Sequence, residues 1–98
     1  MNNKIELLAK TNGRGTVFRK VKEECAELVV ALSHYEEFGA SDRVVQSSDV
    51  LKEVADVEVM LAQLKYLMHG EADVETYKAQ KIGRQLKRFG LKGENDED

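Results

Sequence analysis

The apolar residues of the chain recur at intervals of three and four, and no stretch alternates apolar and polar residues as a half-buried strand does. This spacing predicts amphipathic helices and no sheet. We expect a short helix over residues 4–10 and three long helices over residues 16–38, 49–69 and 74–89. The predicted fold class is therefore all-α.

Glycines separate the predicted helices. The left-handed conformation that closes many helices favours glycine, and each long helical stretch is followed by one: Gly39, Gly70 and Gly90. The pair Gly13 and Gly15 predicts a loop over residues 11–15, after the short first helix.

The predicted helix starts rest on capping residues. We expect a connection over residues 39–47, with one loose turn around residues 43–46. Ser48 is then the N-cap of the second long helix and Asp73 the N-cap of the third, because short polar side chains can accept hydrogen bonds from the free amides of a first turn.

Length and composition limit what the chain can be. Its 98 residues suffice for one domain, which we place at residues 1–93, with residues 94–98 as an acidic tail. No apolar run approaches the roughly 18 residues of a membrane span, and no apolar leader is evident. The single cysteine, Cys25, excludes an internal disulfide and fits a reducing cytoplasm. We therefore expect a cytoplasmic protein with no membrane partner.

The net charge of −3 is unevenly distributed. Without the acidic tail the chain is nearly neutral, so it generates no strong field for nucleic acid, and no nucleic-acid partner is expected. The one local basic feature is the segment 76–93, which contains lysines and arginines but no acid.

Each of the first two long helices places an acid inside its apolar face. At about 100° per residue, Glu24 lies in the middle of the apolar face of the first long helix, with Glu27 about 60° to one side. Glu53 lies within the apolar face of the second long helix, with Asp56 about 60° to the same side. The two helices thus repeat one Glu-x-x-acid arrangement.

Buried carboxylates need compensation, because removing an unpaired charge from water costs several kcal/mol. Two facing acid pairs concentrate like charge, and a divalent cation such as Mg²⁺, which prefers oxygen ligands, relieves the repulsion. The alternative is that the acids lie at the edge of the interface and are neutralised by basic side chains nearby, namely Lys20, Arg19 or Lys52. The residues alone leave both interpretations open.

Two segments carry a resemblance to a known family. Residues 22–28 read KEECAEL and residues 53–57 read EVADV. Together they resemble the E-E-x-x-E and E-x-x-D signature of the MazG-like nucleoside triphosphate pyrophosphohydrolases, which are all-α enzymes. Residues 53–67 look especially similar to the small single-domain members of phages and their bacterial hosts. Ala55 departs from the pattern, since many members have glycine there.

The resemblance implies a magnesium-dependent hydrolase, with Mn²⁺ as an alternative cofactor. Such an enzyme cleaves (deoxy)nucleoside triphosphates between the α and β phosphates, releasing a monophosphate and pyrophosphate. By position, the implied metal ligands are Glu24, Glu27, Glu53 and Asp56. Glu23, Glu24 and Glu53 form the expected catalytic set. Because Glu23 points about 100° away from Glu24, we expect it to orient water or support a ligand rather than bind the metal.

Basic residues can complete a triphosphate site. Lys81 and Arg84 share one stripe of the last helix beside its apolar residues, and Lys20 lies one turn before Glu24. Each is a candidate phosphate-binding residue, and the resemblance supports this role for the last helix. The alternatives are a solvated basic face on that helix and neutralisation of Glu24 by Lys20.

Two function classes follow. The first is the nucleotide pyrophosphohydrolase, and the second is a non-catalytic helical interaction or regulatory module that uses its basic last helix. The wide apolar faces and the open acidic crevice, together with the resemblance, predict a MazG-like helical bundle completed by dimerisation, as a homodimer or homotetramer.

Overall fold

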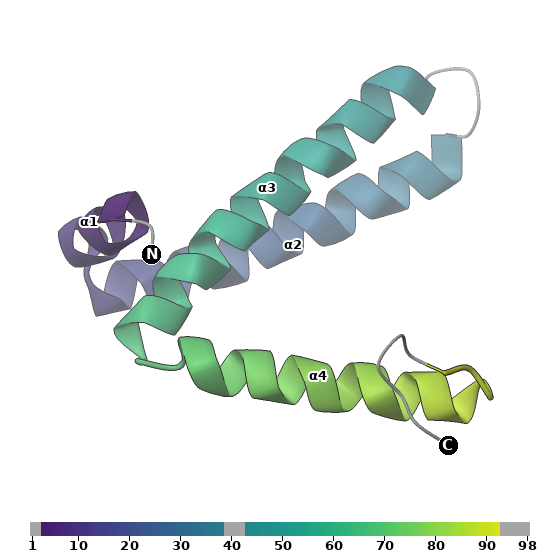
Figure 1. The fold of residues 1–98 in the computed structure, drawn as a ribbon. Helices are drawn as coiled ribbons and strands as arrows, with labels where there is room; N and C mark the ends of the chain where they lie inside the picture. Colours follow the sequence, from purple (N-terminus) through teal and green to yellow (C-terminus); the bar gives the residue numbers. More distant parts are fainter. Residues whose placement is uncertain (1–2, 39–42, 93–98) are drawn as a thin grey trace.

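The computed structural model describes residues 3–38 and 43–92, and these residues are helical with no strand. Four helices follow one another, as Figure 1 shows: α1 (Asn3–Asn12), α2 (Arg14–Phe38), α3 (Arg43–Leu67) and α4 (Glu71–Arg88). The all-α prediction is confirmed, and so is the order of one short helix and three long ones.

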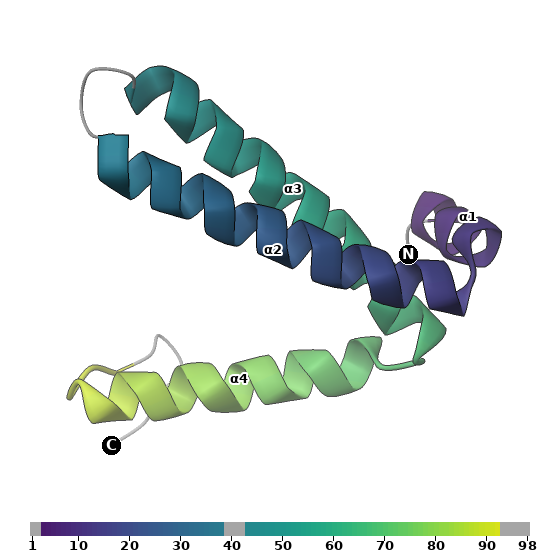
Figure 2. The same cartoon turned by 180° about the vertical axis from the view of Figure 1, so that it is seen from behind.

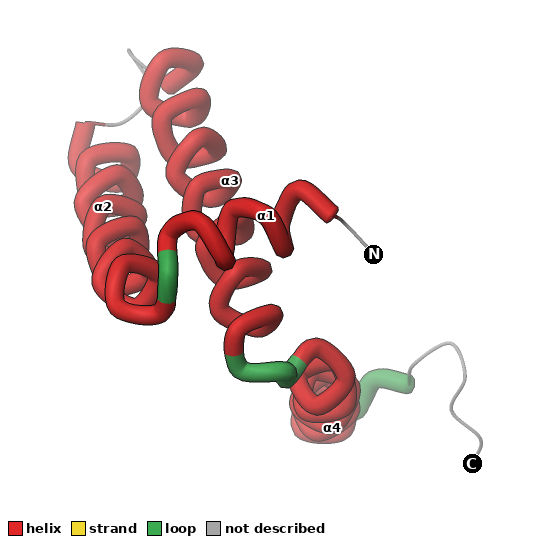
Figure 3. Tube along the Cα trace, turned by 90° about the vertical axis from the view of Figure 1, so that its left-hand side faces the viewer, coloured by secondary structure: helices red, strands yellow, loops and turns green. Residues whose placement is uncertain are grey.

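α2 and α3 lie side by side and antiparallel, whereas α4 turns away from them (Figures 1 and 2). α1 packs against α3 and against the start of α2, and among the described helices α4 contacts only α3. Figure 3 shows α4 standing apart from the α2–α3 pair. The radius of gyration is 17.0 Å, against about 12.6 Å for a compact chain of this length. The single chain is therefore open.

The start of α3 differs from the sequence prediction. The helix begins at Arg43, so the loose turn expected over residues 43–46 and the N-cap expected at Ser48 are both wrong. Ser48 is an exposed residue inside the helix. No glycine or proline interrupts residues 43–48, and a serine inside a helix costs only about 0.5 kcal/mol relative to alanine. Residues 39–42, which include Gly39, lie outside the described residues.

The turn between α3 and α4 also corrects the prediction. The left-handed residue is His69, with φ 52°, while Gly70 has φ −114° and is the N-cap of α4 without a side-chain capping bond. Asp73 is therefore not the N-cap but a first-turn residue, where its charge complements the helix dipole. Gly90, with φ 69°, takes the left-handed conformation predicted for it.

Polar contacts attach α1 to α3, and the sequence analysis did not foresee them. Gly13, at φ 82°, is the one residue between α1 and α2, so the predicted loop over residues 11–15 is shorter than expected. Asn12 Nδ2 donates a hydrogen bond of 2.8 Å to Gln63 Oε1, and Tyr66 Oη donates one of 2.8 Å to Glu6 Oε1. Gln63 is only 2% exposed.

The helices bury few apolar side chains. Among the described residues, the buried ones are Ala9, Val17, Met60 and Gln63. Large apolar side chains remain exposed on all four helices, among them Leu7, Val29, Leu51 and Ile82. No helix in the described part of the chain is both long enough and apolar enough to cross a bilayer.

Candidate metal centre

Three carboxylates converge where α2 crosses α3. Glu24 and Glu27 come from α2 and Glu53 from α3, and one carboxylate oxygen from each lies within 4.8 Å of the others. The i,i+3 spacing brings Glu24 and Glu27 to neighbouring positions on one helix, and the antiparallel packing brings Glu53 opposite them. The structure thus brings together three of the four residues expected to bind a metal.

Two of these carboxylates have a buried oxygen with no partner. Glu24 and Glu53 are half-buried, whereas Glu27 is exposed. Among the described residues, Glu24 Oε2 and Glu53 Oε2 are the buried side-chain polar atoms that no hydrogen-bond donor reaches. An unsatisfied buried carboxylate oxygen is costly, and a cation is one kind of partner that these two oxygens could accept.

The electrostatics agree with this geometry. Burial raises the pKa of Glu24, and the negative charges of Glu27, Asp56 and Glu53 raise it further. Burial also raises the pKa of Glu53, with added repulsion from Glu27 and Asp56. Both shifts have the sign expected of desolvated acids among like charges, and both oppose the ionised form that a divalent cation requires.

Asp56 and Lys20 lie at the edge of this cluster. Together with Glu24 they line an open groove, whose apolar wall is formed by Val59 and Met60. Asp56 is exposed and lies outside the closest group of three, although its charge contributes to the raised pKa of Glu24. Lys20 is the one predicted phosphate-binding residue that lines the groove.

Basic side chains do not neutralise the cluster within the described residues. Arg19 Nη1 lies 2.7 Å from Glu23 Oε2 in an exposed ion pair. The ion pair of Arg19 is therefore with the residue before Glu24 and not with Glu24 itself. The ion pairs of the described part of the chain include none from Lys20 or Lys52 to the clustered acids. Glu23 is exposed and is not one of the three clustered carboxylates.

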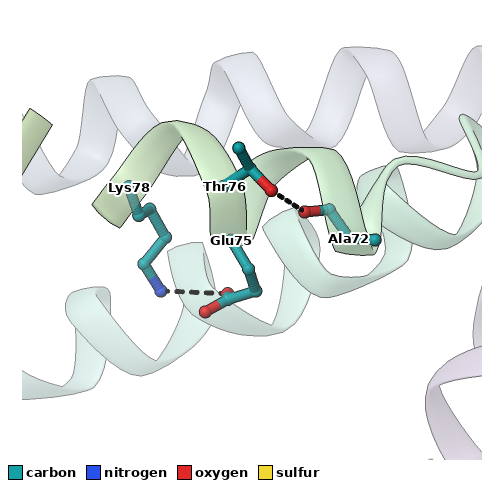
Figure 4. Close-up of polar contacts among 4 residues, drawn as sticks. All are labelled: Ala72, Glu75, Thr76 and Lys78. Carbon is teal, nitrogen blue, oxygen red and sulfur yellow. Dashed lines mark hydrogen bonds and ion pairs between the residues drawn. The ribbon is translucent and has the colours of Figure 1, made fainter. Parts of the chain in front are cut away.

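Lys81 and Arg84 are not brought to the cluster by their own chain. Both are exposed on α4, which contacts only α3 among the described helices. The polar contacts of α4 shown in Figure 4 remain within the helix: Lys78 Nζ to Glu75 Oε2 at 3.2 Å, and Thr76 Oγ1 to the Ala72 carbonyl at 3.2 Å.

Comparisons of the chain with models of protein families, with curated proteins and with solved structures find no match.

Proposed function

We propose that the protein is a magnesium-dependent nucleotide pyrophosphohydrolase, which cleaves (deoxy)nucleoside triphosphates between the α and β phosphates. The observation that carries the proposal is the convergence of Glu24, Glu27 and Glu53 with two buried carboxylate oxygens left unpartnered. A helical hairpin built only for stability gains nothing from such a cluster, because each unpaired acid in it is destabilising. The signature residues of the resemblance are the same residues.

The three clustered acids and Asp56 would approach the metal from different sides. Glu24, Glu27 and Glu53 would hold Mg²⁺, or Mn²⁺ in its place, with Asp56 adding a carboxylate from the groove side. Oxygen ligands of this kind suit a hard divalent cation. When bound, the metal supplies polarisation of the phosphoryl oxygens and a lowered pKa of the attacking water.

The remaining residues would bind and orient the substrate. Lys20 lines the groove beside Glu24 and Asp56, where its ammonium can contact a phosphate oxygen. Glu23, ion-paired with Arg19, would support the position of the adjacent Glu24. Lys81 and Arg84 can contact the phosphates only where α4 of another copy brings them to the groove. We therefore include a homodimer or homotetramer in the proposal, acting in the cytoplasm.

A second candidate function rests on α4. This helix exposes apolar side chains such as Tyr77 and Ile82 beside basic residues, and within the described part of the chain it packs only against α3. These features suit a non-catalytic interaction module whose α4 binds another protein.

Metal-dependent melting separates the two functions. The protein is melted in EDTA and then in millimolar Mg²⁺, and binding to the folded state at about 100 times Kd raises the free energy of unfolding by about 2.7 kcal/mol. A screen of nucleoside triphosphates with pyrophosphate detection then identifies the substrate. An unchanged melting temperature together with no pyrophosphate release would leave the interaction module as the function.

A further inference from the structure

The groove beside the acid cluster has a charged part and an apolar part. Its charged lining consists of Lys20, Glu24 and Asp56, and its apolar wall consists of Val59 and Met60, around a volume of about 240 Å³. Val59 is 42% exposed, whereas Met60 is 8% exposed and so is held firmly among its neighbours. A small ligand in this groove therefore meets charges on one side and a thioether and methyl groups on the other.

The apolar wall lies between the acids and the attachment of α1. Asp56, Met60 and Gln63 follow one another on α3 at intervals of four and three residues, so they occupy neighbouring positions on one ridge of the helix. Met60 is about 6 Å farther along the helix axis than Asp56. Gln63 comes next, and it is the residue that Asn12 of α1 contacts.

Gln63 uses both ends of its amide at this position. Its Oε1 accepts the hydrogen bond of 2.8 Å from Asn12 Nδ2, and its Nε2 donates to Met60 Sδ at 3.6 Å. Attachment of α1 accounts for the first bond only. A thioether is a weak acceptor, so the second bond does little to offset the burial of an amide that is 2% exposed. It does restrict Met60, whose unbranched side chain is otherwise adaptable.

We propose that Met60 contacts the base of the bound nucleotide and that Gln63 is a positioning residue, which holds the Met60 thioether in the groove wall. The inference rests on the proposed function, which places the phosphates at the clustered acids and Lys20. The base then lies toward the apolar wall. A thioether interacts favourably with an aromatic ring, and every nucleobase presents an aromatic face.

The first measurement compares two ligands that differ in the presence of a nucleoside. One is a nucleoside triphosphate with a methylene group between the α and β phosphates, where the proposed cleavage cannot occur. The other is inorganic tripolyphosphate. Both are titrated by calorimetry in Mg²⁺. Met60→Ala should weaken binding of the nucleotide analogue by about 10-fold and leave binding of tripolyphosphate unchanged, because only the analogue has a base.

Met68→Ala is the matched control. Met68 is 59% exposed and does not line the groove, so the same substitution there should change the affinity for neither ligand. Should Met60→Ala fail to fold, Met60→Leu replaces it, because leucine conserves the apolar volume. Met60→Leu should still weaken the analogue by about 2-fold or more, since it lacks the sulfur, and it should leave tripolyphosphate unchanged.

The second measurement tests whether Gln63 acts through the sulfur. Gln63→Leu is titrated with the analogue alone and again in the Met60→Leu background, where residue 60 has no acceptor. It should weaken the analogue by at least about 2-fold in the first case and have no effect in the second. A Gln63 that only attaches α1 would give the same change in both backgrounds, and that outcome would overturn its positioning role.

The outcomes also separate this inference from the proposed function. If the Met60 substitutions left both affinities unchanged or lowered both equally, the contact with the base would be refuted, while Mg²⁺-dependent binding of the two ligands would still support the proposed function. A wild-type protein that bound neither ligand in Mg²⁺ would contradict the proposed function and this inference together.

Discussion

Glu24 on α2 and Glu53 on α3 approach each other across the helix contact, and each keeps one buried carboxylate oxygen without a hydrogen-bond donor. In the metal-free protein this relationship is unfavourable, because burial raises the pKa of both groups and the charges of Glu27 and Asp56 raise it further. In the proposed metal-bound state, the same two oxygens would be ligands of the divalent cation. Removing the charge at either position should therefore stabilise the metal-free protein and lower its activity.

Glu24→Gln and Glu53→Gln should each abolish pyrophosphate release while raising the melting temperature of the metal-free protein. Glutamine keeps the size of the side chain but removes a charge that cation binding requires and that repulsion penalises. We expect activity to fall by more than about 100-fold, since even residues that only support metal ligands are worth about 10–100-fold. Pyrophosphate detection and melting in EDTA measure the two effects.

Glu58→Gln is the control for both substitutions. Glu58 is exposed on α3 and lies about 140° around the helix from Glu53. It should change neither activity nor the response to Mg²⁺. If the metal-free melting temperature instead fell for both Glu24→Gln and Glu53→Gln while activity was retained, the cluster would be a structural charge network and not a metal centre.

The raised pKa values also predict a pH dependence of the metal-free protein. The folded state binds more protons than the unfolded state above the ordinary value of 4.5, so stability falls as pH rises from there through the folded pKa values. In EDTA, the wild-type melting temperature should therefore decrease toward neutral pH relative to that of Glu24→Gln/Glu53→Gln. Saturating Mg²⁺ should raise the melting temperature of the wild type but not that of the double variant, because only the wild type keeps the charges that cation binding requires. If the two melting temperatures changed in parallel with pH in EDTA, the pKa values of Glu24 and Glu53 would not be raised in the folded protein.

The acid cluster could be predicted from the sequence because helical spacing alone determines which residues of one helix share a face. Glu24 and Glu53 lie in the apolar stripes of their helices, so packing those stripes together brings the two acids together. The convergence of Glu27 with them follows from the i,i+3 spacing. The groove position of Lys20 follows from the same wheel.

The position of α4 and the attachment of α1 could not be predicted in this way. Periodicity finds the helix that carries Lys81 and Arg84 but does not determine the turn at His69, on which the direction of α4 depends. Gln63 is polar, so a hydrophobic pattern assigns it to the surface, although its bond to Asn12 allows it to be buried. The attachment of α1 depends on contacts between residues far apart in the sequence.

The corrected start of α3 yields a prediction about Ser48. If Ser48 were an N-cap, its substitution by alanine would lower the free energy of unfolding of the protein by about 1 kcal/mol. Because Ser48 is an exposed residue inside the helix, the substitution should instead raise the free energy of unfolding by about 0.5 kcal/mol, since alanine has the higher helix propensity. The sign of the change in unfolding free energy for Ser48→Ala, measured by urea denaturation, therefore tests where α3 begins.

The bond between Asn12 and Gln63 should contribute to holding α1 on α3. Asn12→Ala removes the donor and leaves Gln63 Oε1 buried without a partner, which costs about 1–3 kcal/mol. Thr11→Ala, at the exposed neighbouring position, should stay within about 0.5 kcal/mol of the wild type.

A double-mutant cycle isolates the bond itself. Replacing both partners by apolar residues of similar size can be nearly neutral, because no polar atom is then left unsatisfied. Adding Gln63→Leu to Asn12→Ala should therefore recover much of the loss, with a coupling energy of about 0.5–3 kcal/mol between the two sites. Urea denaturation of the wild type, both single variants and the double variant supplies the four free energies. Strictly additive effects would show that this hydrogen bond contributes nothing to the attachment of α1, which would then rest on the packing of Ala9 and on the bond from Tyr66 to Glu6.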